Sequence, residues 1–67
     1  MTTAELVTEL RSSRTDLARI VQAVDRDKRS MLAVPARSVR AWEQREPSSW
    51  ARVREWLEEH SITVLEV

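Results

Sequence analysis

The 67-residue chain contains neither cysteine nor glycine. Without cysteine it has no disulfide and no thiolate metal site, so the fold depends on its apolar core. Without glycine it has no glycine-rich phosphate loop, and its helices end without the residue best suited to a left-handed cap. The two absences exclude disulfide scaffolds, cysteine-based zinc sites and glycine-loop nucleotide-binding proteins.

The chain also lacks a long apolar run. No segment approaches the roughly 18 residues of a membrane span, and residues 1–5 are acidic where a signal peptide is basic. We therefore expect a cytoplasmic protein without a membrane partner. Residues 1–67 make one domain, whose core alone rarely supplies more than about 3–5 kcal/mol. Because a second buried surface adds stability, we expect a homodimer.

The formal net charge is zero, but the charges are unevenly distributed. Residues 1–25 sum to −1, residues 26–45 to +4, and residues 46–67 to −3. A basic middle on an otherwise acidic chain is typical of a DNA-facing surface. The alternative interpretation is an ordinary solvated surface of mixed charge.

The fold class predicted from the sequence is all-α. Glycine is absent, there are only two prolines, and strand-like alternation is rare. Thr2 with Glu5, and Ser13 with Asp16, have the spacing of capping boxes that open the first two helices. The apolar tail 62–67 is expected to form a short strand or a last helical turn. The spacing of apolar residues predicts five helices, over 4–11, 14–24, 28–33, 36–45 and 50–59.

The segment 32–43 has the pattern of a corner followed by a helix, and the functional prediction depends on it. Pro35 pushes Val34 away from helical geometry and so predicts a corner before the helix 36–45. On that helix Val39 and Trp42 share one face, while Arg37 and Arg40 share another. An apolar underside and a basic outer face, entered through a corner, suit a helix in the DNA major groove.

The candidate DNA contacts follow from this geometry. Arginine bonds bidentately to guanine, and serine reaches bases or phosphates. Basic side chains elsewhere in the sequence are candidates for phosphate contacts, which position a protein without specifying sequence. We expect base readout by Arg37, Ser38 and Arg40, and backbone contacts by Lys28, Arg29, Arg45 and Arg52.

The remaining apolar surface predicts self-association. Three tryptophans are many for so small a core, and Trp56 lies at the edge of the apolar face of its helix. Trp42, which shares a face with Val39, is expected to be packed in the core. The expected dimer interface consists of Trp56, Ile62, Val64 and Leu65.

No pattern in the sequence indicates catalysis. His60 is the only histidine, and at a helix end it is expected to cap carbonyl groups rather than bind a metal. No cluster of ligand-type residues accompanies it, and no nucleophile has a base at suitable spacing. We expect no enzymatic activity, no cofactor, no metal and no small-molecule substrate.

Residues 34–44, with Pro47 just beyond, resemble the Xre-type helix-turn-helix family of lambdoid phage repressors, Cro proteins and many antitoxins. The similarity covers about residues 28–62. It implies that Ala36, Arg37, Ser38 and Arg40 lie on the DNA side of the recognition helix. It also implies that Leu32, Val34, Val39 and Trp42 hold the two motif helices together. The segment is less similar to MerR and excisionase winged helices. A strand over 31–35 leading a ribbon-helix-helix is a third alternative.

These observations predict a compact five-helix bundle, with the helix-turn-helix motif at about 28–45. The expected function is sequence-specific binding of double-stranded DNA by a small transcriptional regulator, similar to phage repressors or activators. A homodimer would place two copies of the helix 36–45 in successive major grooves. The alternative is a small protein-interaction module, such as an antitoxin, anti-repressor or adaptor, that does not itself bind DNA.

Overall fold

The computed structural model describes residues 2–67, which contain four α-helices and two β-strands. None of the described helices has the length and apolar character needed to cross a membrane. In chain order the elements are α1 (Thr3–Ser12), α2 (Leu17–Asp27), β1 (Met31–Val34), α3 (Ala36–Arg45), α4 (Pro47–Glu59) and β2 (Thr63–Glu66).

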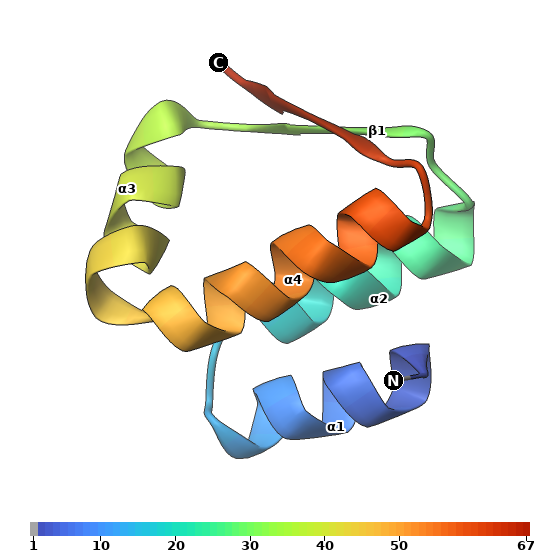
Figure 1. Cartoon of the computed structure of the whole chain (residues 1–67), viewed down its shortest axis with the longest axis horizontal. Coiled ribbons are helices and arrows are strands. Elements are labelled where there is room, and N and C mark those ends of the chain that lie inside the picture. The colour runs from blue at the N-terminus through green and yellow to red at the C-terminus, as the bar shows by residue number, and fades with distance from the viewer. Residues whose placement is uncertain (1) are drawn as a thin grey trace.

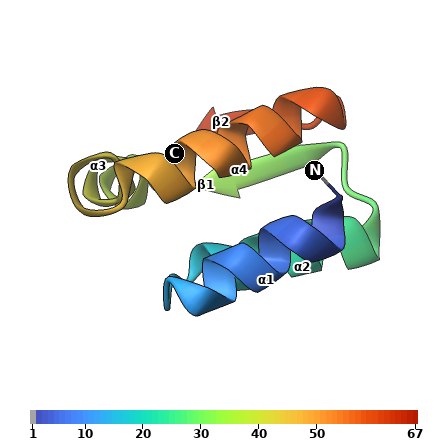
Figure 2. The ribbon, with the colours of Figure 1, turned by 60° about the horizontal axis from the view of Figure 1, so that its bottom comes forward.

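The helices α1 and α2 form an antiparallel hairpin, and α4 packs along both of them (Figures 1 and 2). The two strands lie side by side, with β2 against α4. The helix α3 stands at one end of the molecule, between the end of β1 and the start of α4 (Figure 1). The packing therefore leaves α3 with α4 as its main neighbour.

The sheet is parallel, because α3 and α4 carry the chain back to the end at which β1 begins. Met31 lies opposite Thr63, and Val34 lies opposite Glu66. Backbone hydrogen bonds extend the pairing beyond the strands, since Ala36 N–H donates to the Val67 carbonyl at 3.0 Å. The tail thus forms a strand, one of the two conformations that the sequence allowed.

The core lies between the α1–α2 hairpin, α4 and the inner side of the sheet. Trp42 is half-buried and packs on the buried Trp50, with ring centroids 5.0 Å apart. Both strands contribute apolar side chains from their inner faces. The buried apolar residues are Leu6, Val7, Leu10, Leu17, Ala18, Val21, Val24, Val34, Val39, Trp50, Val53, Trp56, Leu57 and Ile62.

The predicted five-helix, all-α bundle is wrong, because the expected helix over 28–33 does not form. The helix α2 ends at Asp27, and Lys28 takes a left-handed conformation with φ of 50°. Met31–Val34 then forms a strand whose hydrogen-bonding partner lies about thirty residues further along the chain. This pairing between distant segments overrides the local helical pattern.

The predicted helix-turn-helix is lost with that helix, since the element before α3 is a strand. The strand of the third alternative does exist, but it pairs in parallel with the chain's own β2. The helix over 36–45 has the predicted bounds. The helix α4 begins at Pro47, earlier than predicted, because proline is well suited to a first helical position.

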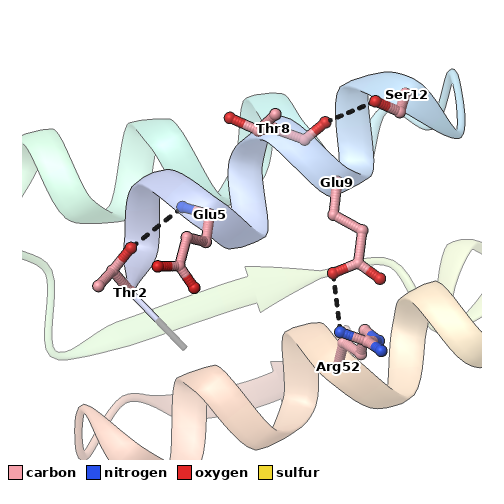
Figure 3. Close-up of polar contacts among 6 residues, drawn as sticks. All are labelled: Thr2, Glu5, Thr8, Glu9, Ser12 and Arg52. Carbon is pink, nitrogen blue, oxygen red and sulfur yellow. Dashed lines mark hydrogen bonds and ion pairs between the residues drawn. The ribbon is translucent and has the colours of Figure 1, made fainter.

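The first capping prediction is supported in part and the second is wrong. The Thr2 hydroxyl accepts a hydrogen bond from Glu5 N–H at 3.2 Å (Figure 3). Ser13 instead ends α1, and α2 begins only at Leu17, whose N–H donates to the Thr15 hydroxyl at 3.3 Å. The delay follows from a left-handed residue, Arg14, between the two helices.

A partly buried hydrogen bond connects the α1–α2 turn to the junction of α3 and α4. The hydroxyl of Thr15, a buried residue, donates to the Glu46 carboxylate at 2.6 Å. Glu46 is the single residue between α3 and α4. Because a charge-assisted bond to a buried hydroxyl is directional, it helps fix the angle at which α3 leaves the body.

Candidate nucleic-acid interface

The helix α3 presents most of its surface to solvent. Val39 is its one fully buried residue, and Trp42 packs partly against α4. Pro35, in extended conformation, directs the chain from β1 into the helix. The helix α3 lies at one end of the molecule (Figure 1). The sheet fixes the position of its first residues, and the hydrogen bond of Glu46 fixes the position of its end.

The outward face of α3 carries Arg37, Arg40 and Gln44, all exposed. At about 100° per residue, these three positions fall within roughly 60° of one another, on the side opposite Val39. Arginine bonds bidentately to guanine, and glutamine bonds bidentately to adenine. We call these three residues the α3 face.

Gln44 was missed from the sequence, although its spacing from Arg37 and Arg40 was a usable signal. Positions seven and four residues apart lie on the same side of a helix. The predicted base-readout residues end at Arg40 and so leave out Gln44, one helical turn further along. The helix geometry places Gln44 between the two arginines around the helix axis.

Ser38 and Arg45 lie on one flank of α3, about 20° apart around the axis. Ser38 is half-buried and Arg45 is exposed. This flank is displaced from the centre of the α3 face, so a ligand seated on that face would meet these two side chains at its edge. Their position suits phosphate contacts better than base contacts for both residues.

The arginines of α3 have no acidic partner within residues 2–67 at ion-pair distance. The helix carries Arg37, Arg40 and Arg45 against the single acid Glu43, and so has a charge of +2. Unpaired guanidinium groups keep their donors free for a ligand. Their local positive potential does not depend on the zero net charge of the chain.

Two of the predicted backbone contacts, Lys28 and Arg29, lie at the other end of β1 from α3 (Figure 1). The strand between them spans about 13 Å at the usual rise per residue. Arg29 lies 3.7 Å from the Asp27 carboxylate, which also accepts a hydrogen bond from Arg26. That hydrogen bond and the nearby positive charges lower the pKa of Asp27, so its carboxylate offsets part of the basic charge there.

Arg52 lies on a third part of the surface. Its guanidinium donates to Glu9 at 2.7 Å and connects α4 to α1 (Figure 3). The predicted DNA contacts are therefore dispersed. Arg37, Ser38, Arg40 and Arg45 are together on α3, whereas Lys28 with Arg29, and Arg52, lie on two other parts of the molecule.

The residues predicted for the dimer interface lie at different depths. Trp56 is buried, and its indole N–H donates to the Thr3 hydroxyl at 3.0 Å. Ile62 is also buried, Val64 is half-buried against the core, and Leu65 is 42% exposed. The side chains of Trp56 and Ile62 are thus buried within the chain. Of the four predicted interface residues, only Leu65 presents a large apolar surface to solvent.

His60 lies beside Trp56, with ring centroids 4.5 Å apart. Its Nδ1 is 2.9 Å from the Trp56 carbonyl oxygen, within the last turn of α4. That carbonyl already accepts the backbone N–H of His60 at 3.1 Å, so the ring lies beside an acceptor that the helix itself has satisfied. The histidine therefore lies at the end of α4, as expected, and its capping role stays a prediction.

Comparison with known proteins gives no match: neither a family model, nor a curated protein, nor a solved structure corresponds to this chain. The features of the molecule that bear on function are the surface of α3, its unpaired arginines and its position at one end of the fold.

Proposed function

We propose that this protein binds double-stranded DNA by placing α3 in the major groove. The observation that carries the proposal is the α3 face, on which two unpaired arginines and a glutamine project from an end of the molecule. A ten-residue helix is about 15 Å long, and a major groove about 12 Å wide admits an α-helix. The function is that of a small sequence-specific transcriptional regulator.

The residues of α3 divide into two roles. Arg37 and Arg40 donate to guanine edges, and Gln44 contacts adenine. Arg45 and Ser38, on the flank, contact phosphates and set the depth of the helix in the groove. The chain needs no helix before α3 for this, because β1 and the Thr15–Glu46 hydrogen bond already hold α3 at both ends.

A second candidate function is a protein-interaction module that does not bind DNA. One observation favours it: the outer side of the sheet carries apolar side chains in solvent. Met31 is 50% exposed and Val67 is 76% exposed, in addition to Leu65. Exposed apolar groups gathered on one face are typical of contact surfaces.

A titration with duplex DNA separates the two functions. The purified chain is titrated into labelled random duplex, and into DNA from upstream of its own gene, at two salt concentrations. For DNA binding we expect preference for one duplex, with log affinity falling by about 0.9 per phosphate contact for each tenfold rise in salt. Absence of binding to both duplexes at low salt would contradict the proposal and favour the interaction module.

A further inference from the structure

We infer that the free edge of β1 binds a second copy of this chain, in antiparallel orientation. The product is a four-stranded sheet with the order β2, β1, β1, β2 across a two-fold axis. This inference goes beyond DNA binding and does not depend on it. It rests on the hydrogen-bonding pattern of β1, on the residues that β1 carries, and on the apolar groove beside it.

The register of the sheet decides which backbone groups of β1 are free. In a parallel pair, alternate residues of a strand bond to the neighbouring strand. Thr63 N–H donates to the Ser30 carbonyl at 3.0 Å, and Val67 N–H donates to the Val34 carbonyl at 2.9 Å. The backbone N–H and C=O groups of the even-numbered residues of β1 are therefore directed toward β2. The N–H and C=O groups of Met31 and Ala33 point to the open edge.

The spacing of Met31 and Ala33 allows their free backbone groups to pair with the same two residues of a second copy. In an antiparallel ladder, a hydrogen-bonded pair of residues exchanges two N–H···O bonds. A two-fold axis midway between the Leu32 residues of the two copies places Met31 opposite the second copy's Ala33, and Ala33 opposite the second copy's Met31. Four backbone hydrogen bonds form, and on the outer face each long methionine side chain meets a small alanine.

The residues of β1 do nothing to block this pairing. Protein sheets protect free edges with charges, prolines or bulges. The strand reads Met-Leu-Ala-Val, with no charge and no proline, and it is paired without a bulge. Two further strands would also extend a sheet that has only two strands of its own.

An apolar groove continues the surface from β1 onto α2. It has a volume of about 240 Å³ and is lined by Ile20, Ala23, Val24 and Leu32, with Arg19 and Arg29 at its rim. Leu32 is half-buried, and the two-fold axis brings the Leu32 side chains of both copies together over this groove. The contact adds apolar burial to the backbone bonds, so the second copy fits both the edge and the surface beneath it.

The opposite edge of the sheet, on β2, is less suited to a second strand. Its outward backbone groups belong to Val64 and Glu66, by the same register argument. The hollow beside it is lined by the charged residues Glu43, Arg54 and Glu66 as well as by the apolar residues Val39, Trp50 and Val64. Covering these charges would cost free energy, which makes β1 the edge that pairs.

Two lysine substitutions test the edge. Met31 and Thr63 are register partners, both are exposed, and both lie on the outer face of the sheet, but only Met31 is on β1. Sedimentation equilibrium of the full chain, without DNA, is expected to give twice the 7.8 kDa of one chain at high concentration. Met31→Lys is expected to weaken association at least about tenfold, because it places two like charges in the interface. Thr63→Lys is expected to leave association unchanged.

Amide hydrogen exchange of the unmodified chain gives a readout that needs no variant. Exchange at Met31 and Ala33 is expected to slow as protein concentration rises, while exchange at Val64 stays the same. Three results would overturn the inference: a single-chain mass over the whole concentration range, an unaltered Met31→Lys dimer, or equal weakening by both lysines. Equal weakening by both lysines would mean that two copies associate through the outer faces of their sheets and not through the edge of β1. All these outcomes are independent of whether the chain binds DNA.

Discussion

Replacing Arg37 and Arg40 together by alanine is expected to weaken binding to a preferred duplex by at least about 30-fold. Each bidentate contact between arginine and guanine contributes about 1–3 kcal/mol, and the double variant removes two of them. Both side chains are exposed on α3, so the free energy of unfolding should change by no more than about 0.5 kcal/mol. Fluorescence anisotropy measures the affinity, and urea unfolding checks the fold.

A matched control removes two arginines from elsewhere. Arg11 and Arg19 are exposed on α1 and α2, and their replacement by alanine changes the net charge by the same amount. We expect only a small loss of affinity and no change in sequence preference, because general charge acts without base contacts. Equal losses in the two double variants would show that α3 has no special role in binding.

Leu57→Ala is expected to bring the free energy of unfolding close to zero, so that a substantial fraction of the protein is unfolded at room temperature. Leu57 is 1% exposed on α4, the helix that packs against α1, α2 and β2. Truncating a fully buried leucine costs about 2–5 kcal/mol. Since a core of this size supplies only about 3–5 kcal/mol, little stability remains. Urea unfolding followed by tryptophan fluorescence measures the loss.

Leu65→Ala serves as the control for that substitution. The same side chain is removed, but Leu65 is 42% exposed on the outer side of the sheet. The expected loss is about 0.5 kcal/mol, measured at a concentration where the chain is monomeric. If Leu65→Ala destabilised the chain as much as Leu57→Ala, the assignment of inner and outer faces to β2 would be wrong.

The helix α3 was predictable because independent local signals agree on it. Pro35 fixes its start, Val39 and Trp42 have helical spacing, and Pro47 limits its extent. All these signals lie within a dozen residues, and none depends on a distant part of the chain. The same holds for the exposure of Arg37 and Arg40, which follows from helix geometry once the buried face is known.

The strand β1 was not predictable with the same certainty, because its partner is distant in sequence. A four-residue apolar segment fits a helix turn or a strand equally well. Residues 31–34 form a strand because residues 63–66 pair with them. That pairing depends on how α3 and α4 fold. The left-handed residue that ends α2 is a lysine, so no glycine marks the boundary.

The predicted DNA contacts are dispersed for the same reason, namely that β1 forms in place of the expected helix. The sequence groups Lys28 and Arg29 with α3 because it predicts a short helix over 28–33 that begins with these two residues. A strand extends over a greater distance per residue than a helix and separates them from α3. The burial of Trp56 likewise depends on Thr3, more than fifty residues earlier, whose hydroxyl accepts its indole N–H.

An NMR titration of the labelled chain with its preferred duplex would locate the DNA-binding element residue by residue. If α3 enters the major groove, the largest shift changes fall in residues 36–45 and include the side-chain N–H groups of Arg37, Arg40 and Gln44. Residues 26–30 and the outer side of the sheet should change little. Shift changes confined to those two regions, or none in α3 at saturating DNA, would contradict the assignment of α3 as the DNA-binding element.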